Sequence, residues 1–154
     1  MLKLQESFIF VDLDAQDSDE VINALASSLH EAGLVKEGYG KATIEREQKH
    51  ATGLPTRPFP IAFPHADADG VHESALAVAT LKTPIGFKNM AEPDEELAVE
   101  LVIMLANKSP EEQIHTLRSL AELFGDPEKL TELRNIKKRV EIVDWLKREL
   151  VLDI

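Results

Sequence analysis

The chain has 154 residues, of which 44% are hydrophobic and 29% charged, so it is long enough to bury one core and too short for two ordinary domains. Its 28 acidic and 17 basic residues give a formal charge of -11, which would repel a phosphate backbone, and we expect no nucleic-acid partner. The lack of cysteine excludes disulfides, thiolate nucleophiles and cysteine-based zinc sites, and leaves histidines and carboxylates to carry any chemistry.

The N-terminal segment MLKLQESFIFVDLD has no apolar run of signal-peptide length after a basic segment. Nowhere do about 18 apolar residues follow one another, which is the length that crosses a membrane. We therefore expect a cytoplasmic protein.

The first part of the chain predicts a strand followed by two helices. Residues 7–13 (SFIFVDL) are apolar, with β-branched and aromatic members, and predict a buried strand. Asp17 is a helix-capping residue ahead of an amphipathic segment that Gly33 ends. A second, more polar helix is predicted over residues 40–50, and it leads into a loop over residues 51–59 (ATGLPTRPF).

Three further strands are predicted in the middle of the chain. Residues 60–64 (PIAFP) form a short one, whereas residues 74–81 (SALAVATL) and 97–106 (LAVELVIMLA) are nearly continuous apolar runs of strand length. Such runs are typical of strands covered on both faces. The sequence therefore predicts a central sheet with helices on its flanks.

The last third of the chain is predicted to be helical. Ser109 and Asp126 each precede a proline, a combination that is typical of helix starts. The segment after Arg139 (VEIVDWLKREL) has apolar residues at helical spacing. We therefore predict a single compact α/β domain over residues 1–154, with a central mixed sheet flanked by helices.

Two histidines and two aspartates gather in residues 60–72 (PIAFPHADADGVH). In an extended segment His65, Asp67 and Asp69 would point to one side, and with His72 they would form a metal site. The small and acidic residues around them instead favour a solvated turn, and we predict no metal. His72 is interpreted as a residue without a chemical role, and so are two helical histidines, His30 and His50.

His65 differs from the other histidines because of the residues that precede it. Pro64 has a fixed backbone angle and restricts Phe63 to extended geometry, so the strand delivers His65 to a defined place where the chain leaves the sheet. A neutral imidazole is nucleophilic near pH 7, and a hydrogen bond from one ring nitrogen to an acceptor leaves the lone pair on the other. His65 is therefore the candidate nucleophile.

Several motifs in order along the chain resemble a known family, the enzyme IIA components of the sugar phosphotransferase system in the fructose and mannitol class. They are an Arg-Glu pair at 46–47, TGL at 52–54, IAFPHAD at 61–67, and a long apolar strand followed by a SPEEQ helix start at 109–113. The resemblance extends from Ser7 to about Leu150.

This resemblance implies a phosphocarrier that uses neither cofactor nor metal. His65 would accept a phosphoryl group from the phosphohistidine of HPr and pass it to a cysteine on a sugar-specific enzyme IIB, so that the chain meets a membrane only through the transporter complex. Transfer of this kind depends on positioning and charge stabilisation. Arg46 matches the family's arginine that would neutralise phosphoryl charge, although its place on a polar helix also fits a solvated charge.

The later helix departs from many relatives, which have a second histidine at its start. The alignment puts Gln113 there, and His115 two residues beyond. Helical spacing places Gln113, Leu117, Leu120 and Phe124 on the inward face and His115, Arg118, Ser119 and Glu122 on the outward one. An amide can still donate to a phosphoryl oxygen or orient the imidazole, so we expect Gln113 rather than His115 near His65. The glutamine and the TGLPTRPF loop most resemble the galactitol branch.

A second departure is the negative charge just beyond the histidine. Asp67 and Asp69 would oppose an incoming phosphoanion unless they point away or an arginine offsets them. Arg57, in the loop, is a candidate for that compensation beside Arg46, and equally an ordinary loop charge.

Two other functions stay open at this point. A regulatory domain would keep the phosphorylatable histidine and use its state to control a partner protein, and a metal-dependent hydrolase would use the histidines and aspartates of residues 60–72. A chain of 154 residues without an attached DNA-binding segment favours the carrier. The sugar is not predicted beyond the galactitol-type resemblance.

Overall fold

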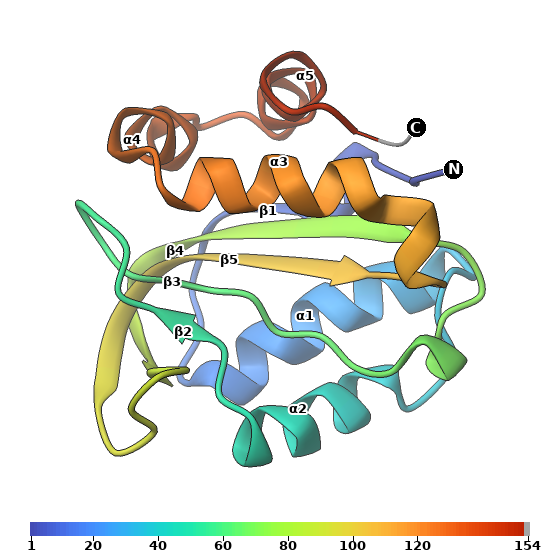
Figure 1. Cartoon of the computed structure of the whole chain (residues 1–154), viewed down its shortest axis with the longest axis horizontal. Helices are drawn as coiled ribbons and strands as arrows, with labels where there is room; N and C mark the ends of the chain where they lie inside the picture. The colour runs from blue at the N-terminus through green and yellow to red at the C-terminus, as the bar shows by residue number, and fades with distance from the viewer. Residues whose placement is uncertain (153–154) are drawn as a thin grey trace.

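Five strands form one mixed sheet in the computed structural model, which describes residues 1–152. The last two residues of the predicted domain, 153–154, lie outside the described residues. Across the sheet the strands are β1 (Ile9–Leu13), β4 (Ala75–Lys88), β5 (Glu96–Ala106), β3 (Ile61–Ala62) and β2 (Gly53–Leu54). The pairs β1–β4 and β5–β3 are parallel, and the pairs β4–β5 and β3–β2 are antiparallel (Figure 1).

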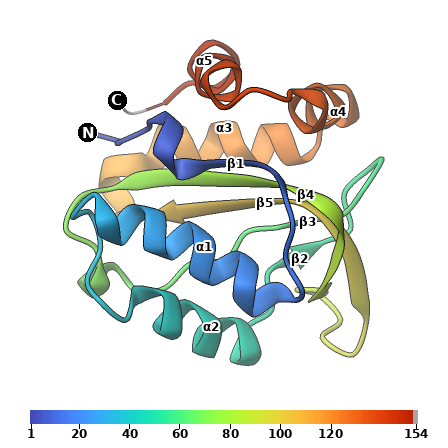
Figure 2. The same ribbon diagram turned by 180° about the vertical axis from the view of Figure 1, so that it is seen from behind.

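Helices cover both faces of this sheet (Figures 1 and 2). One layer contains α1 (Ser18–Glu31) and α2 (Tyr39–Lys49), and the other contains α3 (Ile114–Phe124), α4 (Pro127–Asn135) and α5 (Arg139–Glu149). Short 3-10 helices occur at η1 (Glu6–Phe8), η2 (Ala68–Gly70) and η3 (Pro110–Gln113). The predicted single α/β domain with a central mixed sheet is confirmed. Within residues 1–152 no helix has the length and apolar character needed to cross a membrane.

The two faces of the sheet carry separate parts of the core. Alternate residues of β4 point to opposite faces, so Ala75 and Ala77 pack on the side of α1 and α2 while Leu76 and Val78 pack on the side of the last three helices. All four are fully buried. Burial of one such aliphatic side chain contributes about 1.5 to 3 kcal/mol, which explains why strands covered on both faces are continuous apolar runs.

The ends of the helices follow the sequence closely, with one exception. The Asp17 carboxylate accepts a hydrogen bond from the Glu20 backbone at 3.0 Å, and Asp126 caps α4 in the same way. Gly33 takes a positive φ of 77° after α1. The segment after Ser109, by contrast, begins as the 3-10 helix η3 without a side-chain cap, and α3 starts only at Ile114.

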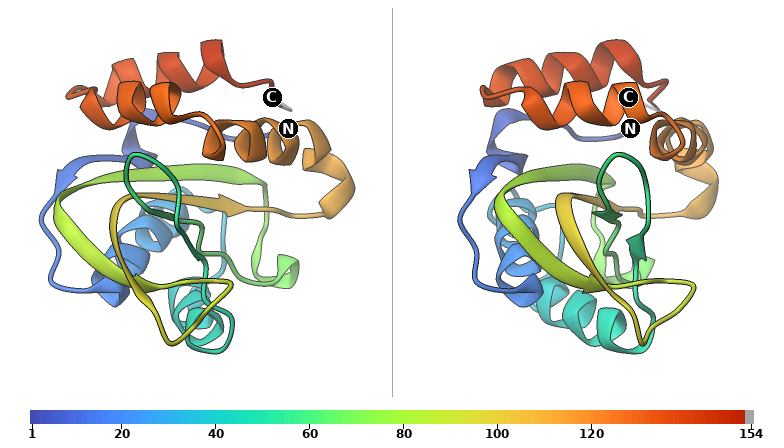
Figure 3. Two further views of the ribbon diagram at one scale, coloured as in Figure 1. Left: turned by 60° about the vertical axis from the view of Figure 1, so that its left-hand side comes forward. Right: turned by 90° about the vertical axis from the view of Figure 1, so that its left-hand side faces the viewer.

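The sheet differs from the prediction at its edges. The first strand begins at Ile9, because the residues before it form η1. The predicted loop contains β2, and Gly53 fits there because a Cβ at this position would lie 2.5 Å from the Lys88 carbonyl oxygen. The loop between β2 and β3 stands along the edge of the sheet toward the α3–α5 layer (Figure 3), where Phe59 joins the core. β4 continues past Leu81, with an irregular register between Thr80 and Ile85.

The inward face of α3 is rotated from the predicted one. The buried residues there are Thr116, Ser119, Leu120 and Leu123, whereas Leu117 is 36% exposed. The predicted positions of Leu117 and Ser119 are therefore wrong. The prediction counted 3.6 residues per turn from Gln113. Gln113 instead belongs to the 3-10 helix η3, which has three residues per turn, so that count does not give the buried face of α3. His115 is exposed, as predicted.

Candidate functional site

His65 lies just beyond β3, on the side of the sheet where β3 and the parallel strand β5 both end. Its side chain is half-buried. The Nδ1 atom lies 3.0 Å from the backbone carbonyl oxygen of Phe63. Because a carbonyl oxygen can only accept, Nδ1 carries the proton and the lone pair belongs to Nε2. The hydrogen bond that fixes one tautomer, expected for a nucleophilic imidazole, is therefore present.

The Phe63 ring connects this imidazole to the helical layer. Its centroid lies 5.8 Å from that of His65 and 5.5 Å from that of Phe124, at the end of α3. The two phenylalanines meet edge to face, which is a favourable aromatic geometry. The ring of His65 is thus placed by packing as well as by its hydrogen bond.

The backbone N–H of Phe63 is connected through Thr52 to the Glu47 carboxylate by a chain of hydrogen bonds. Glu47 accepts from both the backbone N–H and the hydroxyl of Thr52, at 2.9 and 2.7 Å. The Phe63 N–H in turn approaches the Thr52 hydroxyl and carbonyl oxygens, each at 3.3 Å. Burial raises the pKa of Glu47, while the two Thr52 hydrogen bonds and the charge of His65 act to lower it.

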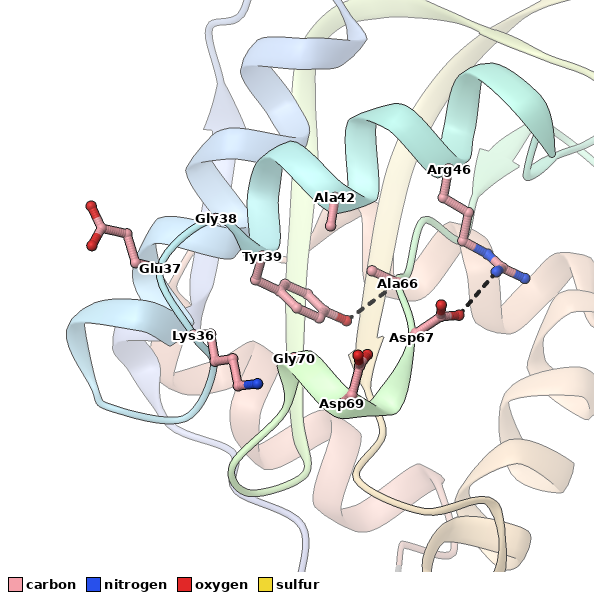
Figure 4. A pocket seen from close by; sticks show the side chains of 10 residues that line it. All are labelled: Lys36, Glu37, Gly38, Tyr39, Ala42, Arg46, Ala66, Asp67, Asp69 and Gly70. Atoms are coloured by element: carbon pink, nitrogen blue, oxygen red, sulfur yellow. Dashed lines mark hydrogen bonds and ion pairs between the residues drawn. The ribbon is translucent and has the colours of Figure 1, made fainter.

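Arg46, the residue before Glu47 on α2, forms an ion pair with Asp67. The Arg46 Nη1 atom lies 3.3 Å from the Asp67 Oδ1 atom, and the side chains are 37% and 82% exposed. Both line an open cavity of about 350 Å³, and Figure 4 shows Asp67 pointing toward the guanidinium. An arginine therefore offsets the carboxylate that would oppose a phosphoanion. The Arg46 Nε atom is buried and has no hydrogen-bond partner among the described residues.

Tyr39 holds the segment after His65 from the same cavity. Its hydroxyl oxygen accepts a hydrogen bond from the Ala66 backbone at 3.3 Å (Figure 4). The ring is 3% exposed, and burial raises the pKa of its hydroxyl. Tyr39 therefore remains a neutral hydrogen-bonding group at physiological pH.

Gln113 begins the helical return at the edge of the sheet where β5 ends, and its side chain is fully buried. Its Oε1 atom accepts from the Thr116 hydroxyl at 2.8 Å, and its Nε2 atom has no hydrogen-bond partner within residues 1–152. An unpartnered buried amide is costly and needs an explanation. Its approach to His65 stays a prediction.

Arg57 does not join this site. It is exposed in the loop that begins after the last pair of the β2–β3 hairpin, Leu54 with Ile61. His65 leaves β3 at the other end, and the loop is separated from it by the length of the strand. Compensation of the aspartates by Arg57 is therefore not supported.

The metal interpretation of residues 60–72 loses its geometric basis. The residues Ala68–Gly70 form the 3-10 helix η2, which breaks the alternation that would point His65, Asp67 and Asp69 to one side. Within the described part of the chain, no group of three or more His, Cys, Asp or Glu side chains is placed to hold a metal ion.

Sequence reasoning did not assign roles to Glu47, Thr52 or Tyr39. Glu47 and Thr52 belong to recognised motifs, but their contacts with each other and with Phe63 join segments whose pairing no local pattern reveals. Tyr39 lies at the first position of α2, and nothing in the sequence around it distinguishes it from an ordinary buried aromatic residue.

Comparison with known proteins places this geometry among related domains. The model of the family described as "Phosphoenolpyruvate-dependent sugar phosphotransferase system, EIIA 2" matches residues 3–149. The transcriptional regulator ManR of Bacillus subtilis (strain 168) is 32% identical over 138 residues, which are 90% of this chain and only 20% of ManR. The chain thus spans about a fifth of that relative's length.

Two Escherichia coli proteins extend the comparison. The galactitol-specific EIIA component of the phosphotransferase system in strain K12 is 28% identical over 121 residues, covering 79% of this chain and 80% of that protein. The structure of a complex of enzyme IIAMTL and phosphorylated enzyme IIBMTL matches with a TM-score of 0.75 at 23% identity, covering 96% of this chain and 99% of that one. The latter likeness shows a shared fold.

Proposed function

The chain belongs to the EIIA 2 family of the phosphoenolpyruvate-dependent sugar phosphotransferase system, and we propose that it is a cytoplasmic phosphocarrier whose His65 accepts a phosphoryl group from phospho-HPr and passes it to an enzyme IIB. The observation that carries the proposal is the hydrogen bond from His65 Nδ1 to the Phe63 carbonyl oxygen. It leaves the lone pair on Nε2 of a half-buried ring, as a nucleophile requires.

Each transfer forms one bond and breaks another. The Nε2 lone pair attacks phosphorus, the N–P bond of phospho-HPr breaks, and its electron pair returns to the imidazole of HPr. The His65 ring then carries a positive charge, because Nδ1 keeps its proton and still donates it in a hydrogen bond to the Phe63 carbonyl oxygen. In the second transfer a cysteine thiolate of enzyme IIB attacks the same phosphorus, and the electron pair returns to Nε2. No general base is needed in either step, and positioning carries most of the catalysis.

Arg46 stabilises the transferred group in this proposal. Its guanidinium neutralises Asp67 in the structure described here, and the exposed ion pair is weak enough to open. When a phosphoryl group arrives on His65, the arginine turns from the carboxylate to the phosphoryl oxygens. Gln113 supplies a second donor through its unpartnered Nε2 atom.

The partners and the sugar are inferred from relatives. A structurally similar IIA protein forms a complex with phosphorylated enzyme IIBMTL, which supports an enzyme IIB as the acceptor. The formal charge of -11 suits partners with basic surfaces. The similarity to a galactitol-specific EIIA component supports a galactitol-type sugar, whose selection would belong to the membrane subunit.

A regulatory role is the second candidate, and the similarity to ManR favours it. In that role phosphorylation of His65 would change the activity of a partner protein without onward transfer to an enzyme IIB. The two roles share the first transfer and differ in the second.

The test is incubation with phosphoenolpyruvate, enzyme I and HPr, followed by addition of a galactitol-type enzyme IIB. Wild type and His115→Ala should take the label, whereas His65→Ala should not. Loss of the label to enzyme IIB supports the carrier, and retention favours regulation. Labelling of His65→Ala at the wild-type level would contradict both roles.

A further inference from the structure

Glu47 is a half-buried carboxylate that the transfer chemistry does not use, and its hydrogen bonds lead toward the proposed phosphoacceptor. It follows Arg46 on α2. Arg46 forms an ion pair with Asp67 in the cavity, whereas Glu47 accepts hydrogen bonds from Thr52. Burial disfavours its charged form and raises its pKa. Its hydrogen bonds connect it, through Thr52 and Phe63, to His65.

The contacts form a continuous path in three steps. The Thr52 hydroxyl donates its only proton in a 2.7 Å hydrogen bond to the Glu47 Oε1 atom, so toward any other group the hydroxyl oxygen can only accept. That oxygen approaches the Phe63 N–H at 3.3 Å. The carbonyl oxygen of the same residue, Phe63, then accepts from His65 Nδ1 at 3.0 Å. The Glu47 carboxylate therefore helps to fix, through Thr52, the position of the Phe63 backbone, whose carbonyl oxygen selects the imidazole tautomer.

We propose that Glu47 and Thr52 are positioning residues for His65, and that they act through Phe63 to keep the proton on Nδ1 and the lone pair on Nε2. The inference rests on the proposed function for its kinetic consequence. Its structural part, the choice of tautomer, stands apart from any partner protein.

A carboxylate suits this task better than an amide. Thr52 offers Glu47 two donors, its N–H and its hydroxyl, and the two carboxylate oxygens accept one each. A glutamine has one acceptor oxygen, so it would leave one donor unpaired or reverse the hydroxyl. Reversal would turn the hydroxyl proton away from the amide at position 47 and toward the Phe63 N–H, which would then lose the hydroxyl oxygen as an acceptor.

The charge of Glu47 adds a second effect. The phosphorylated ring is cationic while Nδ1 keeps its proton, and a fixed negative charge nearby favours that state. The charge of His65 acts to lower the pKa of Glu47, so the two groups lie within electrostatic reach of each other.

The test combines the ring nitrogen shifts of His65 in ¹⁵N NMR, at a pH where the imidazole is neutral, with the rate of labelling by phospho-HPr. The variants are Thr52→Val, which keeps the shape and removes the hydroxyl, Thr52→Ser, which restores it, and Glu47→Gln. Glu45→Gln and Thr83→Val are matched controls, because both side chains are exposed.

Wild type should show Nδ1 protonated and Nε2 unprotonated. Thr52→Val and Glu47→Gln should increase the share of the Nε2–H tautomer and slow labelling about two- to tenfold, the range expected for one hydrogen bond. The range is modest because the Phe63 N–H also approaches the Thr52 carbonyl oxygen. Thr52→Ser and both controls should match wild type in shifts and rate.

Unchanged ring nitrogen shifts in both Thr52→Val and Glu47→Gln would overturn the proposal. If Thr52→Val fails to fold, Glu47→Gln decides, since it keeps the size of the side chain. If the variants change the tautomer but phospho-HPr does not label wild type, the positioning role is supported and the proposed function is contradicted. If phospho-HPr labels wild type but the variants leave the tautomer unchanged, the proposed function is supported and the positioning role is contradicted.

Discussion

Replacing Arg46 with alanine is expected to slow phosphoryl transfer far more than it destabilises the fold. The Arg46–Asp67 pair, at 3.3 Å, joins side chains that are 37% and 82% exposed. Exposed pairs of this kind contribute about 0.2 to 1 kcal/mol to stability. The free energy of unfolding of Arg46→Ala should therefore lie within about 1 kcal/mol of wild type.

The effect on transfer is larger because the arginine meets a charge that the phosphoryl group brings. Loss of one such donor in an enclosed site costs about 2.7 to 4 kcal/mol in the transition state. Solvent reaches Arg46, so we reduce this to about 1.4 to 2.8 kcal/mol, or roughly 10- to 100-fold in rate. Part of the loss comes from Asp67, which remains as an unpaired negative charge near the reacting group.

The assay follows the rate of labelling by phospho-HPr at saturating donor, with urea unfolding of each variant as the control. Arg46→Ala combined with Asp67→Asn should recover part of the lost rate, because the opposing carboxylate charge is removed. Transfer by Arg46→Ala at the wild-type rate would refute the assigned role of the arginine.

Three further predictions concern polar side chains that are partly or fully buried. The raised pKa of Glu47 means that the folded state binds its proton more tightly, so as pH rises above the ordinary value of 4.5 the free energy of unfolding of wild type should fall relative to Glu47→Gln. Urea titrations across that range measure the difference, and a constant difference would contradict it. Gln113→Met removes an amide whose Nε2 atom is unpartnered, but it also removes the acceptor of the Thr116 hydroxyl, so the free energy of unfolding should stay within about 1 kcal/mol of wild type while labelling slows; an unchanged rate argues against its supporting role. Arg134 donates to the Leu81 carbonyl at 3.1 Å and lies 3.7 Å from Asp12, so Arg134→Ala should lower the free energy of unfolding by about 1 to 3 kcal/mol. Its labelling rate should not change, because Asp12 and Leu81 lie on β1 and β4, and its third partner, Glu100 at 3.5 Å, lies on β5 rather than on the segment that carries His65; a slower rate would connect this cluster to the site.

The sequence predicted the layers of the fold well where the signal was local and periodic. The polar helix α2 occurs within one residue of its predicted limits at each end, and α5 packs through the apolar residues of its predicted segment. The strand β4 was predicted too short because the apolar run that indicated it ends at Leu81, before Lys82 and Pro84. In the structure the register irregularity between Thr80 and Ile85 accommodates the proline, as bulges do.

In the candidate site, too, contacts between residues close in sequence could be predicted, whereas contacts between distant segments could not. The tautomer of His65 depends on a carbonyl only two residues away, and the strand and Pro64 suffice to predict that such a bond can form. The path from Glu47 through Thr52 needs α2, β2 and β3 to meet, and no periodicity in the sequence specifies that meeting. The phase of α3 could not be predicted either, because the 3-10 helix before it shifts the face that it buries.

The most direct test of the account is the chemical position of the phosphoryl group in the labelled protein. Wild type, enriched in ¹⁵N and phosphorylated through phosphoenolpyruvate, enzyme I and HPr, should show coupling between ³¹P and the Nε2 atom of His65. The Nδ1 atom of the same ring should keep its proton, because the Phe63 carbonyl oxygen holds it. A phosphoryl group on Nδ1 of His65, or on any other residue, would contradict the account.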